Sequence, residues 1–482
     1  MKIWGNHKAL PLFFIFLLIG LSSCDSLKKV QEPTKPTTST NEEEELDEIQ
    51  GKRVYNPETG DYEVVTDVTG ELDTIVWTEP ALEEVVPPIT SDATQNGGEA
   101  VFDEDTELLF SYNLVLALPF LADRYNAADN KIDRRSIPAL NFYEGAKMAF
   151  DVLSGEGVNL EVSVLDTRAS EGSTIQLTNN YEAQTAHLII GTFRNSTARA
   201  MAEFAKNNST PFVSPIFPHQ NLTNDNPFFI QLNPSAKTHA EAIMGHAKNK
   251  FQPDQIVVFG RNIEQEQELM QYYLDAHFAI EGSTNVDTIQ LVTIDKDTMS
   301  IDDFDFEPYM NELSSTAFII ASSNQSFVYA MLRNLDLKKE DHSIVVYGQP
   351  RWKNFTQIGY QYYETMNVHI TSDAYLNPDN FDVQSFKEGF YNKFGMPPTT
   401  EAFKGYDTAL FFGRMLKEFG TGFKGKLDQN AKDGLHTRFD IQRAVTGPLE
   451  SVEGADLNRF DQFMNKHLNI LEFTGYQFRK AD

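Results

Sequence analysis

The sequence has 482 residues, of which 41% are hydrophobic and 12% aromatic, and its formal net charge is −30 at pH 7. This length suffices for two or three domains, and the negative charge argues against nucleic acid or anionic lipid headgroups as the main partner. The single cysteine excludes an internal disulfide and a cysteine-ligated metal site.

The N-terminus has the order of an export signal. Basic residues precede an apolar and small run over 9–20, which is too short to span a bilayer. The Leu21-Ser22-Ser23-Cys24 that follows resembles the bacterial lipobox, in which signal peptidase II cuts before the cysteine and lipid is attached to it. Residues 1–23 are then a signal peptide, and Cys24 anchors a lipoprotein to the inner or outer membrane of the cell envelope, facing the periplasm or the surface. The alternative is an ordinary cleaved signal with an unrelated cysteine.

Residues 24–106 predict an acidic, disordered tether. Residues 41–107 contain 21 Asp or Glu against two basic residues. A segment of this kind buries too little apolar surface to fold, and its charges repel and extend it. Two short alternating stretches, Tyr62–Val65 and Thr74–Trp77, are candidates for transient pairing. The acidic run is alternatively a recognition or export signal.

From about residue 107, apolar runs alternate with segments of helical periodicity. The expected strands are 114–118, 162–165, 187–191, 211–214, 255–260, one within 286–294, 317–321 and 343–348. The expected helices are 138–153, one ending near 183–186, 197–206, 236–250, 264–278 and 326–335, followed by a helical C-terminal third with short strands. This alternation predicts βαβ units, parallel sheets and a protein of two successive α/β halves.

Three segments carry a resemblance to a known family: NFYEGAKMAFDVL, LIIGTFRNSTARAMAEFAKNNSTPFVSPIF and FKEGFYNKFGMPPTTEAFKGYDTALFFG. Over roughly 108–480 the chain resembles the type I periplasmic solute-binding proteins, in the branch that binds leucine, isoleucine and valine. The resemblance implies an α/β fold of two Rossmann-like lobes with parallel central sheets, joined by three hinge crossovers and closed by a ligand.

The same resemblance implies the domain boundaries. Lobe 1 is 107–232 and 373–445, lobe 2 is 233–372, and 446–482 completes both. The crossovers are expected near Leu232, near Ile370–Asp373 and after Gln442.

Ligands of open α/β sheets bind beyond the carboxyl ends of the strands. This rule and the resemblance select ten candidate ligand residues: Phe120, Asn195, Ser196, Thr197, Ser214, Phe217, Arg261, Ser322, Gln349 and Arg351. Ser196 directly precedes an expected helix, so its hydroxyl and the first free N–H groups either hold a carboxylate or merely cap the helix.

Some candidates depart from the family pattern. After Ser214-Pro215 the family usually has a small residue and then a hydroxyl residue, whereas this chain has bulky Ile216 and Phe217, the latter a pocket wall or a core residue. Arg261 either pairs with an anion or is a solvated loop charge. Gln349 stands where the family offers an acid to an ammonium group, and Glu264 is the candidate substitute.

No P-loop, serine-hydrolase, zinc-protease or EF-hand motif occurs, and the ten histidines lack metal-ligand spacing. We therefore expect a binding protein rather than an enzyme, with no catalytic residue, metal or cofactor. Its expected task is to capture an amino-acid-like or peptide-like solute for an ABC-type transporter permease or a receptor. The alternative is a lipoprotein of the same fold that regulates a peptidoglycan synthase through protein contact, which the tether and the missing acid favour.

Overall fold

The computed structural model describes residues 52–56, 61–65 and 106–481, except 129–130, 217–221, 224, 282–288, 296–300, 302–303, 312, 340 and 445–460. The chain divides into two units, 1–97 and 98–482. In the first unit β1 (Lys52–Asn56) pairs antiparallel with β2 (Asp61–Val65). The segment Thr74–Trp77, Cys24 and the rest of the expected signal peptide and tether lie outside the described residues.

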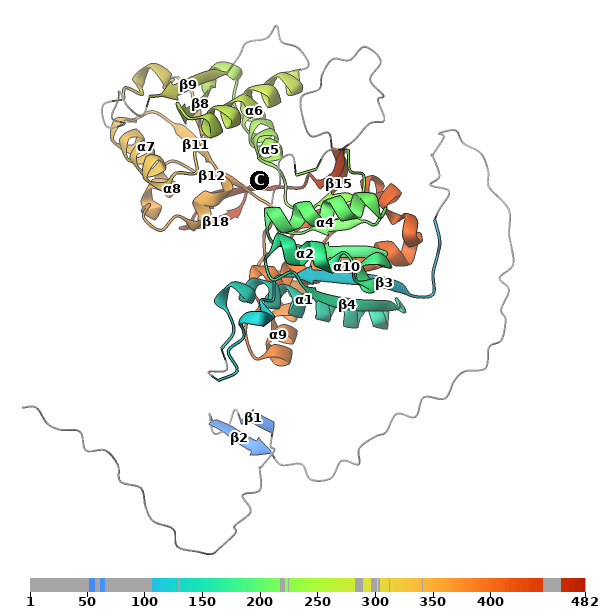
Figure 1. The fold of residues 1–482 in the computed structure, drawn as a ribbon. Coiled ribbons are helices and arrows are strands. Elements are labelled where there is room, and N and C mark those ends of the chain that lie inside the picture. Colours follow the sequence, from blue (N-terminus) through green and yellow to red (C-terminus); the bar gives the residue numbers. More distant parts are fainter. Residues whose placement is uncertain are drawn as a thin grey trace, which may run out of the picture. The chain divides into compact units, whose positions relative to one another are not determined.

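The second unit is built on two seven-stranded, mostly parallel sheets with helices on both faces (Figure 1). In lobe 1 the strand order is β15-β16-β7-β6-β5-β3-β4. These strands are β3 (Tyr112–Leu118), β4 (Leu160–Asp166), β5 (Leu188–Gly191), β6 (Phe212–Ser214), β7 (Phe229–Gln231), β15 (Ile441–Ala444) and β16 (Gln462–Asn465). The helices of lobe 1 are α1 (Ile137–Gly155), α2 (Glu171–Leu177), α3 (Tyr181–Gln184), α4 (Asn195–Asn207), α9 (Phe381–Phe394) and α10 (Thr400–Phe419).

In lobe 2 the strand order is β18-β17-β12-β11-β10-β8-β9. These strands are β8 (Ile256–Arg261), β9 (Gln290–Ile294), β10 (Thr316–Ile320), β11 (Ile344–Gly348), β12 (His369–Ser372), β17 (Asn469–Thr474) and β18 (Gln477–Lys480). The helices of lobe 2 are α5 (Ala236–Lys248), α6 (Glu264–Glu281), α7 (Gln325–Lys338) and α8 (Tyr360–Thr365). The α/β class with two lobes and parallel-dominated sheets is confirmed.

The central strands are apolar throughout because both faces of each sheet are covered. Along β3, Leu114 and Leu116 pack in the core cluster that holds α1 and α10. Val115 and Ala117 lie in a second cluster with residues of α4. Successive side chains of a strand point to opposite faces, so an uninterrupted apolar run serves two helical layers at once.

The chain crosses between the sheets three times in the described residues. It leaves lobe 1 after β7, returns after β12, and enters lobe 2 again between β16 and β17. The last crossover is the short stretch 466–468, so the C-terminal segment gives β16 to lobe 1 and β17–β18 to lobe 2.

Two features of the elements differ from the sequence prediction. The expected single helix ending near 183–186 is two short helices, α2 and α3, separated by residues 178–180. The three-residue strand β7 was not expected, because a strand that short has too few residues to show a periodicity. Among the described residues, no helix has the length and apolar character needed to cross a membrane.

Candidate functional site

A hollow with a cavity volume of about 910 Å³ lies at the carboxyl ends of the lobe 1 strands. The loops after β3, β4, β5 and β6 each contribute to its lining. The lining residues are Pro119, Leu121, Arg135, Pro138, Ala169, Phe193, Arg194, Asn195, Ser196, Ile216 and Glu401. This is the edge of the sheet that the general rule for open α/β folds selects, and we call it the lobe 1 pocket.

The N-terminus of α4 opens into this pocket. Asn195 and Ser196 are exposed first-turn residues of the helix, and both line the pocket. No side chain caps the helix at Arg194, so Ser196 is not a cap and that alternative is wrong. Thr197 is buried and its hydroxyl donates to the Arg194 carbonyl at 2.9 Å. The free N–H groups of the first turn can therefore hold an anion in the pocket.

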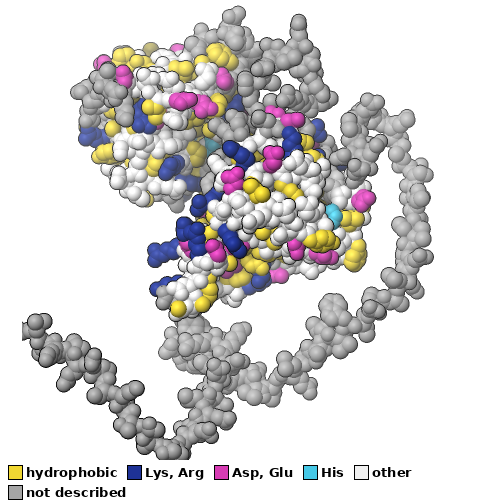
Figure 2. Space-filling view, in the orientation of Figure 1, with side chains coloured by type: hydrophobic (Ala, Val, Ile, Leu, Met, Phe, Trp, Pro, Cys, Tyr) yellow, Lys and Arg dark blue, Asp and Glu magenta, His cyan; other side chains and the backbone are white. Residues whose placement is uncertain are grey.

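Three charged side chains of the pocket were missed by the sequence reasoning: Arg135, Arg194 and Glu401. Arg135 forms a two-pronged contact with Asp133, and this hydrogen bonding holds the pKa of Asp133 well below its usual range. Within the described part of the chain, the side chains of Arg194 and Glu401 have no hydrogen bond or ion pair. Figure 2 shows Lys and Arg side chains gathered on this side of lobe 1, although the chain as a whole is acidic.

Glu401 stands in the first turn of α10, more than 200 residues after Arg194. Only the folded chain brings its carboxylate to the pocket that holds the α4 N-terminus. The pocket therefore offers positive charge from α4 and Arg194 together with one negative charge. A molecule with both a carboxylate and an ammonium group matches this pair of charges.

The rim of the pocket is held in a fixed backbone conformation. Leu121, Arg168 and Ala169 adopt the left-handed region with φ of 53°, 50° and 50°. The Asp166 carboxylate accepts hydrogen bonds from the N–H groups of Leu121, Ala122 and Arg168 at 3.1, 2.8 and 2.8 Å. Non-glycine residues in this region are strained and persist where the surroundings hold them, often at ligand sites.

The corresponding edge of lobe 2 is filled by its own polar contacts. The Glu266 carboxylate accepts from the Arg261 backbone N–H at 2.7 Å and from the Arg261 guanidinium at 2.5 Å. Ser322 donates to the same carboxylate at 2.5 Å. The expectation of a solvated Arg261 is therefore wrong, because the buried Glu266, which the sequence reasoning missed, engages it. Glu264, the expected acid, is exposed.

Two further candidates lie after β11. Gln349 is buried and its side chain donates to the Tyr273 hydroxyl at 2.8 Å. Arg351 is exposed on a short 3-10 turn, Pro350–Asn354. The neighbouring Trp352 is fully buried, and its indole N–H donates to the Ser322 carbonyl at 2.9 Å.

Two of the remaining candidates, Ser214 and Phe120, are not among the described residues that line the pocket. Ser214 is completely buried at the end of β6. Phe120 is half-buried and its ring meets Tyr143 edge-to-face at 5.8 Å. Phe217 lies outside the described residues. Of the ten candidates, the structure thus places Asn195 and Ser196 in the lining of the lobe 1 pocket.

The crossover after β12 is tied to lobe 1 by an ion pair from Lys404 and is contacted from lobe 2 by Lys353. Lys404 of α10 forms an ion pair with Asp373 at 2.8 Å, and Lys353 donates to Ser372 at 3.3 Å. Burial raises the pKa of Asp373, but Lys404 and Lys353 outweigh this and hold it well below the usual range. A small cavity here is lined by residues of all three crossover regions, including Leu232, Asp373 and Asn465.

The charged groups of the described residues do not point to a metal centre. No group of three or more His, Cys, Asp or Glu side chains is arranged to hold an ion within that part of the chain.

Comparisons with known proteins agree with this fold. A family model described as "Periplasmic binding protein" matches residues 137–431. A search of curated proteins gives no match in sequence.

Three solved structures illustrate the likeness in fold. A protein from Rhodospirillum rubrum named as a branched-chain amino acid ABC transporter has a TM-score of 0.57 at 15% identity, covering 76% of this chain and 99% of that one. An ABC transporter substrate-binding protein from Desulfitobacterium hafniense has a TM-score of 0.50 at 15% identity, covering 77% and 100%. A branched-chain amino acid ABC transporter periplasmic ligand-binding protein from Burkholderia xenovorans has a TM-score of 0.50 at 12% identity, covering 77% and 94%.

Proposed function

Because the chain belongs to the periplasmic binding protein family, we propose that it captures a small zwitterionic solute, amino-acid-like or peptide-like, in the lobe 1 pocket. The observation that carries the proposal is the pairing of the uncapped α4 N-terminus and Arg194 with the carboxylate of Glu401 in one lining. The ligand carboxylate lies at α4 and its ammonium group faces Glu401. The role is binding rather than catalysis.

The rest of the proposal concerns where the solute is delivered. Lipid on Cys24 anchors the protein to the cell envelope, and the acidic segment up to residue 106 is its tether. An ABC-type permease or a receptor receives the solute. In support, the similar structures from Rhodospirillum rubrum and Burkholderia xenovorans are named as an ABC transporter and an ABC transporter periplasmic ligand-binding protein.

Closure of the two lobes around the ligand is the proposed mechanism of capture. The chain crosses between the lobes three times, and a ligand that binds the closed form better shifts the population toward it. In the closed form we expect lobe 2 to contact the ligand through its exposed groups at the strand ends. Arg261 and Ser322 are not expected to do so, because both already donate to the Glu266 carboxylate.

Calorimetry against a panel of amino acids and short peptides tests the proposal, with small-angle X-ray scattering to detect closure. We expect one site per chain and a smaller radius of gyration in the presence of the ligand. If the whole panel is silent and the radius does not change, solute capture is the wrong function.

One observation favours a second candidate function, the regulation of a peptidoglycan synthase through protein contact. Arg261, Ser322 and Gln349 of lobe 2 are engaged by its own residues, which leaves fewer groups for a small ligand. Retention of a purified peptidoglycan synthase by the immobilised protein, combined with a silent solute panel, would favour this candidate.

A further inference from the structure

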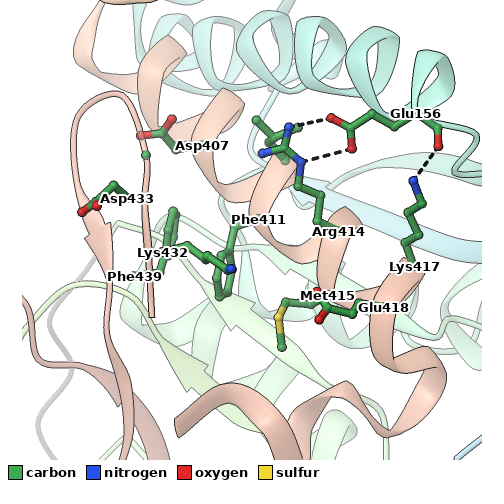
Figure 3. Close-up of a pocket in the computed structure, with 12 residues that line it drawn as sticks. Glu156, Asp407, Phe411, Arg414, Met415, Lys417, Glu418, Lys432, Asp433 and Phe439 are labelled. Carbon is green, nitrogen blue, oxygen red and sulfur yellow. Dashed lines mark hydrogen bonds and ion pairs between the residues drawn. The ribbon is translucent and has the colours of Figure 1, made fainter. Parts of the chain in front are cut away.

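A second pocket lies on lobe 1, away from the α4 N-terminus (Figure 3). It lies between α10, the end of α1 and the hairpin of β13 (Lys432–Asp433) and β14 (Arg438–Phe439), with a cavity volume of about 520 Å³. Glu401 lines the lobe 1 pocket and Arg414 lines this second pocket, and the two residues lie about 20 Å apart along α10 at the usual helical rise. We call it the hairpin pocket, and its volume is in the range of small-molecule sites.

The hairpin pocket has an apolar floor. Phe411 and Phe439 stack with ring centroids 4.4 Å apart and planes 11° from parallel, and Leu410 and Met415 extend the floor. Both rings are nearly buried, at 6% and 2% exposed, so a ligand contacts only the part of each ring that lines the cavity. A flat or extended apolar body suits this narrow contact.

Most charges of the pocket are already paired. Arg414 binds the Glu156 carboxylate through two N–H groups at 3.1 and 2.5 Å. Asp433 is paired with Arg438 at 3.0 Å. Asp407 accepts from the backbone N–H groups of residues 435 and 436 at 2.8 and 2.9 Å.

Lys432 differs from these groups. It is exposed, and its ammonium group has no hydrogen bond or ion pair with another described residue. In Figure 3 its side chain extends toward Phe411, whereas Asp433 points away and Glu418 lies on the other side of Phe411. A carboxylate at the Lys432 end of the apolar floor would gain a charge-assisted contact.

The hairpin also contacts the crossover after β12. The His436 carbonyl accepts from the Tyr375 N–H at 2.8 Å, and the Thr437 hydroxyl donates to the Asp373 carbonyl at 2.6 Å. Phe439 lines both the hairpin pocket and the small cavity between the crossovers. A molecule packed on Phe439 therefore contacts the same hairpin that holds the crossover.

We propose that the hairpin pocket is a second binding site, which takes a small apolar carboxylate with its body on Phe411 and Phe439 and its carboxylate at Lys432. Its occupancy stiffens the hairpin and, through Tyr375 and Asp373, the crossover on which lobe closure depends. The site does not depend on the solute proposed for the lobe 1 pocket.

Calorimetry on the purified full chain tests the proposal with 3-phenylpropanoate and its neutral amide, 3-phenylpropanamide, as probes. We expect the carboxylate to bind, the amide to bind about fivefold more weakly, and Lys432→Gln to weaken the carboxylate by a similar factor. Lys387→Gln, a half-buried lysine of α9 outside both pockets, should leave the affinity unchanged. Arg194→Ala should also leave it unchanged, because Arg194 belongs to the lobe 1 pocket.

Hydrogen exchange measures the link to the crossover. We expect the probe to slow exchange of the amides of Leu435, His436 and Tyr375, which donate the hydrogen bonds described above. The proposal is overturned if the carboxylate does not bind, if Lys432→Gln binds it as well as the unmodified chain, or if only Arg194→Ala abolishes binding. Binding without slower exchange at Tyr375 would overturn the link to the crossover.

Discussion

Gly405 of α10 lies directly against the backbone carbonyl of Phe142 in α1, so closely that an added Cβ would overlap the carbonyl oxygen. Gly145 of α1 meets Ala402 of α10 in the same way, so two glycines let these helices approach at backbone distance. Gly405→Ala must push the helices apart. We expect it to lower the free energy of unfolding by about 2 kcal/mol or more, measured by urea denaturation.

The matched control for this prediction is Gly155→Ala at the end of α1. Apart from its chain neighbours and the backbone of its own helix, no atom lies within 4 Å of an added Cβ there. The free energy of unfolding should stay the same or rise by up to about 1 kcal/mol, because alanine restricts the unfolded chain. Equal losses for Gly405→Ala and Gly155→Ala would contradict the close approach of α1 and α10.

Arg194→Ala and Glu401→Gln should each weaken binding of the solute in the lobe 1 pocket. Each removes one charge-assisted contact, for which we expect about a tenfold loss of affinity in calorimetry. Arg199→Ala is the control, since Arg199 is an exposed residue of the same helix outside the lining. If Arg194→Ala binds the solute like Arg199→Ala, the Arg194 side chain does not hold the carboxylate.

Glu266→Gln should destabilise lobe 2 without a direct effect on the lobe 1 pocket. The substitution removes the negative charge opposite the Arg261 guanidinium. It also replaces one of two acceptor oxygens with an NH2 donor, although the Arg261 backbone N–H, the Arg261 guanidinium and Ser322 all donate here. Breaking a buried pair in this way costs about 3 kcal/mol, seen as a lower midpoint in chemical denaturation. The control is Glu264→Gln, an exposed residue two positions earlier. A similar midpoint for both variants would show that the Arg261–Glu266 contact contributes little.

How much the sequence could predict depends on how local the signal is. The run Leu114–Leu118 and the 3.6-residue pattern from Pro138 are local, so the strand and helix they predict are present in β3 and α1. The loops at the strand ends follow from the rule for parallel sheets, which is why Asn195 and Ser196 were found.

The rest depends on contacts between distant residues. Glu401 reaches the lobe 1 pocket only because α10 packs on α1 through its glycines. Glu266 follows Arg261 by five positions, but whether that arginine faces a ligand or this carboxylate depends on how β8 joins α6. The pairing of β16 with β7 spans more than 200 residues and has no local pattern to reveal it.

Cys24→Ser should release the protein from membranes. If Cys24 carries lipid, the unmodified chain labels with an alkynyl palmitate analogue and pellets with membranes, whereas the variant does neither. Ser23→Thr, a substitution at the residue beside Cys24, is the control for the effect of a change near the cleavage site. An unmodified chain that neither labels nor pellets would favour an ordinary cleaved signal. A Cys24→Ser variant that still labels would place the lipid on another residue.

Stability should fall as the pH drops from about 6.5 to 4, because burial lowers the pKa of His369 and of His246 to about 4. The ring centroids of these two histidines lie 5.2 Å apart, and Nδ1 of His246 lies 3.0 Å from the Tyr347 hydroxyl. The unfolded chain binds protons at these rings near pH 6.5 and the folded chain only near pH 4, so the stabilisation is complete above pH 6.5 and is lost on acidification.

We expect the buried His369 to account for up to about 3 kcal/mol of this loss. His369→Gln should therefore flatten the dependence of the unfolding free energy on pH in that window. An unchanged slope in His369→Gln would show that this ring does not titrate with unfolding.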